Sequence, residues 1–448
     1  MLFNSWPFFV LLGVTFALYY LPGLARLQVP ILIAASFVFY GAHRPVLLLL
    51  LIASIVINAL ASHRIYYGAP SRQRAWAVAG VTVNLGILLF FKYSGLLYRT
   101  FVSAAPHDAV GQFFVTLPLP IGISFFTFQG ISLVVDTYRS RHDGARLVEV
   151  QPRFAAHLVV IAFFKAFFPQ LVSGPIVKAH EFLPQIGEKR LRDIQWDVAF
   201  RALVVGYFLK MVVADNLRAE TEWLSFPAFE VWSSATLLAM LFGYSMQIFA
   251  DFAGYSSIAI GVAALFGYRL PINFNFPYIS ASFSEFWTRW HISLSTWLRE
   301  YLYLPLGGNR RGRARTYVNL MIVMGLGGLW HGATWSYAIW GIWHGLLLAV
   351  ERALGGNRVK PGLTAWWRAT IVFAFVTAGW LLFKLPDVHD VLAYLAALRD
   401  HRGYPHNQLL MLHVALFSLP VVAWHVAYAF RAQAPHRSFA PRLAPIAL

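Results

Sequence analysis

The sequence predicts an all-α, polytopic integral membrane protein, and three observations support this fold class. Hydrophobic residues make up 58% of the chain and charged residues only 12%, against about 25% charged residues in soluble globular domains. Apolar segments whose length as a helix is close to the thickness of a bilayer recur along most of the sequence. The basic residues lie in short loops between these segments, and this positive-inside pattern accounts for most of the net charge of +17. We therefore expect no nucleic-acid partner.

The N-terminal third is predicted to form four helices, at about 6–24, 29–42, 45–62 and 75–98. No Lys or Arg precedes the first and no small-residue cleavage pattern follows it, so we expect a retained helix and not a signal peptide. Loops with several arginines alternate with a polar loop that has none, which predicts a periplasmic N-terminus. The absence of cysteine excludes disulfides and thiolate catalysis.

Two stretches further along do not resemble regular spanning helices. Residues 117–135 begin Leu-Pro-Leu-Pro and contain Gln129, and proline at membrane depth indicates backbone that is buried in protein or lines a cavity. Residues 163–185 contain Lys165 and several other polar residues and prolines. We expect a broken or re-entrant element there, with a surface amphipathic helix as the alternative.

Polar residues also interrupt the spans expected at about 196–216 and 231–250. The second of these meets Asp251 and Tyr255 in otherwise apolar sequence. Carboxylates within a membrane usually face a cavity or a partner. The structural alternative is that Asp251 caps a helix that begins at residue 254 or 255.

The spacing Ser282-Phe-Ser-Glu285 is that of a capping box and predicts a helix from there to about Leu304. Its apolar residues recur at intervals of three and four, at Trp287, Trp290, His291, Leu294 and Leu298. Arginines interrupt this surface, which makes it too charged for a lipid-facing span. We expect an in-plane or cavity-lining helix that carries His291 inward.

A glycine-rich loop with four arginines follows this helix and contains Asn309, Arg310, Arg311 and Arg313. One interpretation is a cytoplasmic loop that only fixes the topology. The other is a binding site for an anionic donor such as the phosphates of coenzyme A, which guanidinium groups suit. No phosphate-binding motif of the Walker type is present.

Residues 316–350 contain no charged residue but include His331 and His344. As one helix this stretch would be about 50 Å long, well beyond the roughly 30 Å of a bilayer core, so it predicts two helices with a break at 332–336. A neutral imidazole at that break is suited to act as a general base. His344 is interpreted as structural. No metal is expected, because carboxylate or thiolate ligands do not accompany the histidines at a recognisable spacing.

Several long motifs occur in an order that resembles the membrane-bound O-acyltransferase family, in its bacterial branch that acetylates polysaccharides. They are Leu119-Pro-Ile-Gly-Ile-Ser-Phe-Phe-Thr-Phe-Gln129, Phe168-Pro-Gln-Leu-Val-Ser-Gly-Pro-Ile176, Asp251-Phe-Ala-Gly-Tyr-Ser, Asn273-Phe-Asn-Phe-Pro-Tyr278, Phe286-Trp-Thr-Arg-Trp-His-Ile-Ser-Leu-Ser295, Trp297-Leu-Arg-Glu-Tyr-Leu-Tyr303, Pro305-Leu-Gly-Gly-Asn-Arg310 and Leu329-Trp-His-Gly-Ala333. The resemblance covers most of the chain as far as about Arg352.

This resemblance implies the roles of individual residues. His331 matches the histidine expected to activate the acceptor hydroxyl, and His291 matches a second active-site histidine. A supporting shell is expected from Asp251, Tyr255, Trp287, Trp290, Trp330 and Gln129. The resemblance also implies about 11 to 13 transmembrane or re-entrant helices in a ring around a central funnel, with the donor entering from the cytosol and the acceptor from the other side.

The sequence therefore predicts an O-acetyltransferase of the bacterial inner membrane, with one membrane-embedded domain at 1–430, a motif-bearing core at about 117–352 and a basic, proline-rich tail at 431–448. We expect no permanently bound cofactor. The expected donor is a cytosolic acyl thioester, acetyl-CoA or an acylated carrier. The expected partners are membrane lipid, an extracytoplasmic polysaccharide acceptor and a periplasmic acetyltransferase-like or esterase-like protein that relays the acetyl group.

Three alternatives remain open from the sequence. The enzyme could transfer another acyl group, such as D-alanine to teichoic acid. It could transfer acetyl to peptidoglycan or cellulose. The chain could instead transport a lipid-linked sugar, with the histidines as a proton relay, although a transporter would be expected to contain two internally related halves, which the sequence lacks.

Overall fold

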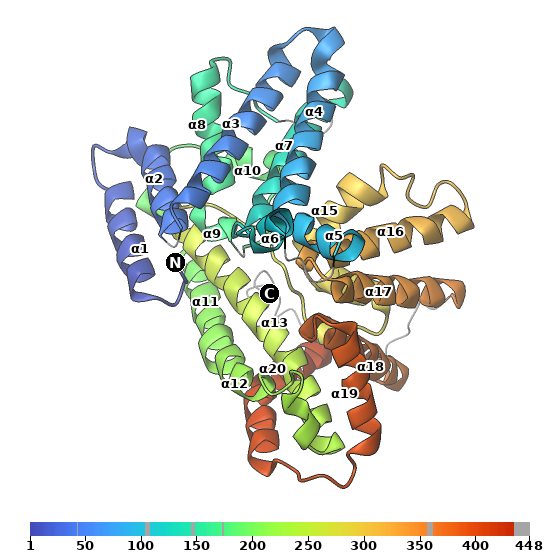
Figure 1. Cartoon of the computed structure of the whole chain (residues 1–448). Coiled ribbons are helices and arrows are strands. Elements are labelled where there is room, and N and C mark those ends of the chain that lie inside the picture. The colour runs from blue at the N-terminus through green and yellow to red at the C-terminus, as the bar shows by residue number, and fades with distance from the viewer. Residues whose placement is uncertain (43, 104–107, 145–147, 173, 356–361, 434–448) are drawn as a thin grey trace. The chain divides into compact units, whose positions relative to one another are not determined.

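The structure is a computed structural model that describes residues 1–42, 44–103, 108–144, 148–172, 174–355 and 362–433. These residues form helices joined by turns and loops, without a β-strand among them (Figure 1). The predicted all-α fold is confirmed. The chain divides into two compact units, Met1–Val204 with Ser256–Pro271, and Val205–Tyr255 with Ile272–Leu448. From residue 434 onward, the predicted basic tail lies outside the described residues.

In the described part of the chain, five helical runs are long and apolar enough to cross a membrane. They are α3 (Val46–Tyr67), Pro70–Phe101, α13 (Ser234–Leu265), α18 (Leu363–Lys384) and Gln408–Arg431. Three shorter apolar helical runs cover Trp6–Tyr19, Ala25–Gly41 and Phe154–Ala166. The chain is thus a multi-pass membrane protein. The number of crossings and the ring arrangement stay predictions.

The first unit is built around a packed group of three helices, α3, α4 (Pro70–Leu88) and α7 (Ile123–Asp143) (Figure 1). Asn58 of α3 and Asn84 of α4 exchange amide hydrogen bonds of 3.2 and 2.8 Å. The backbone of α7 approaches both amides at Gly130, where a Cβ would lie within 2.8 Å of their side chains. Small residues and paired amides are the usual means of helix association in membranes.

The polar stretch at 163–185 is a broken element, as predicted. Helix α8 (Phe154–Ala166) ends there and is followed by two four-residue helices, α9 (Phe168–Leu171) and α10 (Ala179–Phe182). The side chain of Lys165 is fully buried, and its ammonium group donates a hydrogen bond of 2.7 Å to the hydroxyl of Ser54. A lysine in an apolar helix is therefore hydrogen-bonded inside the unit, to a residue that a sequence pattern alone does not indicate.

The second unit carries the histidines singled out by the sequence. Its helices are α12 (Asp215–Thr221), most of α13, α14 (Phe283–Arg289), α15 (Ile292–Leu298), α16 (Arg313–His331), α17 (Trp335–Ala353), α18, α19 (Val388–Asp400) and α20 (Gln408–Gln433). Helices α16 and α17 lie side by side (Figure 1). The turn between them contains Gly332, so the predicted break after His331 is confirmed.

Candidate active site

The helix predicted from Ser282 to Leu304 begins as expected. The Ser282 hydroxyl accepts a hydrogen bond of 2.9 Å from the backbone N–H of Glu285. The same helix start has a second cap, which was not predicted from the sequence. The carboxylate of Glu351 in α17 accepts hydrogen bonds of 2.9 Å from the N–H groups of Phe283 and Ser284. A carboxylate at a helix N-terminus satisfies free N–H groups and complements the helix dipole.

The prediction of one continuous helix is wrong, because the chain breaks at His291. This residue has a φ of 43° and separates α14 from α15. Left-handed backbone at a residue other than glycine is uncommon and is held only where surrounding contacts enforce it. The break therefore interrupts the helical spacing of apolar residues that the sequence suggests.

The Asn273-Phe-Asn275 segment provides those contacts on both sides of the break. The N–H of Asn275 donates to the carbonyl of Arg289 at 3.0 Å, and the N–H of Ile292 donates to the carbonyl of Asn273 at 2.9 Å. Between them, the ring of Phe274 packs perpendicular to Trp290, with centroids 5.0 Å apart. An extended segment thus clamps the residues that flank His291.

The two candidate histidines meet in this unit. The rings of His291 and His331 have centroids 6.2 Å apart, and Trp330 packs against both, at 5.6 and 5.1 Å. On its other side, His291 contacts the ring of Phe252, at 4.6 Å. His291 is 1% exposed and lies outside the candidate spans. Burial lowers the pKa of its imidazole and the neighbouring His331 lowers it further, so the neutral form is favoured.

A cavity of about 270 Å³ lies against His331. Its walls come from α14, α15 and the turn after it, α16 and α17. They are formed by Trp287, Leu294, Ser295, Leu298, Arg299, Tyr303, Leu320, Val323, Met324, Gly327, His331, Trp340 and Leu348. His331 lines this cavity. His291 does not line it but packs against the ring of His331. Mostly apolar pockets with a few polar groups are the usual form of a small-molecule site.

The cavity is elongated along α16. Its α16 residues run from Leu320 to His331 at helical spacing on one face, a distance of about 16 Å. The α17 residues follow in reverse, with Trp340 near the His331 end and Leu348 near the Leu320 end, because the two helices are antiparallel. The side chain of Arg299 also lines the cavity.

The arginine loop precedes the N-terminus of α16, at the end of the helix opposite His331. Asn309, Arg310, Arg311 and Arg313 are exposed and do not belong to the cavity wall. Arg313 begins α16, so about 27 Å of helix separates it from His331. Their predicted role in donor binding stays a prediction. Sequence reasoning did not select Arg299, although an arginine in an otherwise apolar helix face was the available signal.

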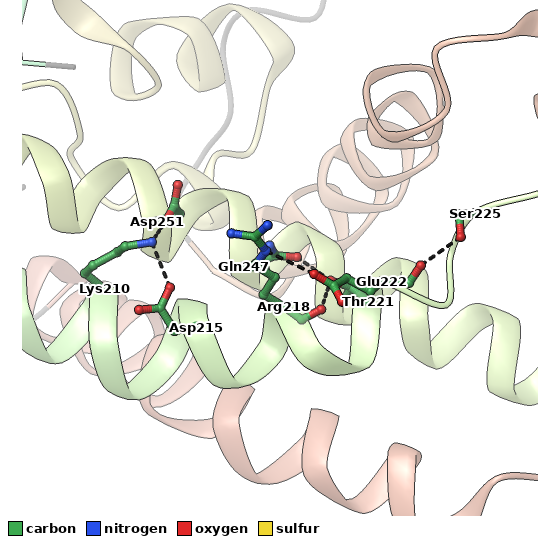
Figure 2. Close-up of polar contacts among 8 residues, drawn as sticks. All are labelled: Lys210, Asp215, Arg218, Thr221, Glu222, Ser225, Gln247 and Asp251. Atoms are coloured by element: carbon green, nitrogen blue, oxygen red, sulfur yellow. Dashed lines mark hydrogen bonds and ion pairs between the residues drawn. The ribbon is translucent and has the colours of Figure 1, made fainter. Parts of the chain in front are cut away.

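Asp251 lies within α13 and does not cap a helix, so the structural alternative for this residue is wrong. Figure 2 shows the ammonium group of Lys210 between two carboxylates, 2.6 Å from Asp251 and 2.7 Å from Asp215. Lys210 belongs to a π-helical turn, Phe208–Ala214. The same ammonium group lies 5.1 Å from the centroid of the Tyr255 ring. The sequence could not pair Asp251 with a residue 41 positions earlier.

Replacing Lys210 by methionine is expected to destabilise the protein. The Lys210 side chain is 11% exposed and those of Asp215 and Asp251 are 38% and 42% exposed, so its loss would leave two partly exposed carboxylates without their cation. Hydrogen bonds to charged groups contribute about 1.5–3 kcal/mol, so the Tm in detergent should fall.

The matched control is Arg218→Met, which removes an ion pair to Glu222 whose side chains are 66% and 64% exposed. That pair lies further along the same helical run (Figure 2). Exposed pairs contribute about 0–1 kcal/mol, so its Tm should hardly change. Equal Tm values for wild type and Lys210→Met would refute the structural importance of the Lys210 pairs.

The remaining predicted shell residues, Trp287, Trp290 and Gln129, occupy different positions, and so does His344, which was interpreted as structural. Trp287 lines the cavity. Trp290 lies behind it in the core and stacks on Phe286 with centroids 5.6 Å apart. Gln129 is buried in α7 and belongs to the first unit. His344 is fully buried beside Trp287 and Trp340, with centroids 5.2 and 4.9 Å away. The roles of these shell residues stay predictions.

The fold and site define a class of protein: the chain belongs to the membrane-bound O-acyltransferase family, whose model matches residues 110–385. It is therefore an acyltransferase. This membership sets aside the transporter interpretation of the two histidines.

Individual relatives extend the match over most of the chain. A probable alginate O-acetylase of Pseudomonas aeruginosa is 39% identical over 87% of this chain and 73% of the relative. A probable alginate O-acetylase of Pseudomonas syringae is 36% identical over 96% and 80%. A peptidoglycan O-acetyltransferase of Helicobacter pylori is 34% identical over 83% and 74%.

Proposed function

We propose that this chain is a membrane O-acetyltransferase that moves acetyl from a cytosolic thioester, acetyl-CoA, toward hydroxyl groups of an extracytoplasmic polysaccharide. The observation that carries the proposal is the elongated cavity that His331 lines. The relatives named as O-acetylases of alginate and peptidoglycan support acetyl as the group and a polysaccharide as the acceptor.

The shape of the cavity suits a donor with a long thioester arm. The arm would lie along α16, with its thioester beside His331 and its other end toward Leu320 and Leu348. The exposed arginines at the start of α16 would then hold the phosphates of the donor. The positive-inside pattern of these arginines supports a cytosolic position for this end, with His331 toward the acceptor side.

In the proposed reaction, His331 acts as the general base. Its imidazole accepts the proton of the acceptor hydroxyl while that oxygen attacks the thioester carbonyl carbon. Collapse of the tetrahedral intermediate breaks the carbon–sulfur bond, and the imidazolium returns the proton to the departing thiolate. A carbon–oxygen bond replaces the carbon–sulfur bond, and no net proton is taken up. His291, which contacts His331 but not the cavity, orients that ring.

The acceptor that meets His331 is proposed to be either the polysaccharide or a hydroxyl of a periplasmic protein that relays the acetyl group. Transfer of D-alanine is a weaker candidate. The teichoic acid D-alanyltransferase of Bacillus subtilis is 28% identical over 60% of this chain, below the identity and coverage of the O-acetylases.

The test is thioester cleavage by the purified wild-type protein in lipid nanodiscs. Acetyl-CoA labelled in the acetyl group is supplied with alginate or peptidoglycan glycan, and free coenzyme A and labelled polymer are measured. We expect release of coenzyme A with transfer of label to polymer, or to an added relay protein. A folded protein that neither cleaves acetyl-CoA nor transfers its acetyl group would overturn the proposal.

A further inference from the structure

We propose that Trp287 and Trp340 limit the transferred acyl group to two carbons, because their rings line the cavity beside His331, where the thioester must react. This inference rests on the proposed function. It assigns selection among acyl donors to two side chains at one end of the cavity, and not to the cavity as a whole.

The His331 end of the cavity is lined by aromatic rings. The rings of His331 and Trp340 are nearly perpendicular, with centroids 5.3 Å apart. Trp287 and Trp340 meet each other with centroids 5.8 Å apart, and all three residues line the cavity. An acyl chain that extends past the reacting carbonyl would therefore meet an indole.

The Trp340 indole has little room to move aside, and the partly buried Trp287 packs against rings on one side. Trp340 is 1% exposed, stacks on Trp380 at 5.5 Å and contacts Phe383 at 5.4 Å. Trp287 is backed by Phe286 and His344, with centroids 5.6 and 5.2 Å away. Protein interiors are close-packed, so an extra methylene forces shifts that oppose binding.

The remaining length of the cavity cannot accommodate a longer acyl chain. His331 fixes the thioester carbonyl at one end, and the part that runs toward Leu320 and Leu348 is taken by the thioester arm. A longer acyl group must either displace an indole or draw the carbonyl away from His331. A single methylene in an apolar pocket changes selectivity by about 10- to 200-fold.

The experiment compares acetyl-, propionyl- and butyryl-CoA with wild type, Trp287→Ala and Trp340→Phe in nanodiscs. Wild type should prefer acetyl-CoA in kcat/KM. The ratio of kcat/KM for butyryl-CoA to that for acetyl-CoA should rise at least tenfold in Trp287→Ala. The milder Trp340→Phe variant keeps an aromatic ring in the core and should raise the same ratio by a smaller factor.

The matched control is Leu348→Ala, which enlarges the same cavity at its opposite end, about 12 Å along α17 from Trp340. Its KM should change for all three donors together and leave their ratio as in wild type. Acetyl transfer with unchanged ratios in both tryptophan variants, or an equal shift in Leu348→Ala, would overturn this inference alone. Absence of transfer from every donor by folded wild type would overturn the proposed function and, with it, this inference.

Discussion

Replacing His331 by alanine is expected to abolish acyl transfer while the protein stays folded. His331 is the histidine that lines the cavity, so it is the one placed to take a proton from a hydroxyl beside a bound thioester. General-base catalysis by a positioned side chain contributes about 10²- to 10⁴-fold in rate, and the loss should appear in kcat. The measurement is transfer from labelled acetyl-CoA, with Tm as the test of folding.

Two further histidine variants test whether the loss of activity is specific to His331. His291→Ala should retain more activity than His331→Ala, because His291 contacts the ring of His331 without reaching the cavity. His389→Ala, in the exposed first turn of α19, should behave as wild type, since that side chain is 79% exposed. Substantial activity in His331→Ala, or an equal loss in His389→Ala, would contradict the assigned base.

Much of the local structure around this site follows from short-range signals in the sequence. The capping box at Ser282 and Glu285 and the length of the uncharged stretch at 316–350 correctly predicted one helix start and one break. Both signals are local, because a cap requires only residues three positions apart and the length of an apolar run is read from the run itself. Length alone does not enforce a break, since α13 continues over 32 residues.

The features that escaped prediction depend on contacts distant in sequence. The break at His291 contains no glycine or proline, and the apolar spacing continues through it. It is held instead by Asn273 and Asn275 from another segment. The same reason applies to the pairing of Asp251 with Lys210 and to the Glu351 cap of α14. Periodicity reports which face of a helix is apolar and not which partner that face meets.

The cavity depends both on local sequence signals and on contacts distant in sequence. His331 was predicted from the break in the uncharged stretch and from the motif Leu329-Trp-His-Gly-Ala333, but the elongated form of the cavity depends on how closely α16 and α17 pack. Each helix contributes a glycine to this contact. A Cβ at Gly328 would overlap the carbonyl oxygen of Tyr337 and lie 3.0 Å from the Cα of Gly341. The close approach therefore positions the His331 end of the cavity, three residues after Gly328.

Gly328→Ala is expected to separate α16 from α17, with a lower Tm and at least a tenfold loss of acyl transfer. The added methyl group meets backbone atoms, which cannot rotate away as a flexible side chain can. Overpacking of this kind costs about 1–3 kcal/mol. A shift of α17 would also carry Trp340, the neighbour of Gly341, away from His331.

Gly325→Ala in the same helix is the matched control for the loss of a glycine. A Cβ there would meet only Ile342, at 3.8 Å, which is an ordinary van der Waals distance. Alanine favours helix over glycine by about 1 kcal/mol, so its Tm should equal or exceed that of wild type with activity preserved. If Gly328→Ala matches wild type in both Tm and activity, the glycine contact does not position the cavity. If Gly325→Ala is equally impaired, the effect comes from replacing any glycine of α16 by alanine and not from the close approach of α17.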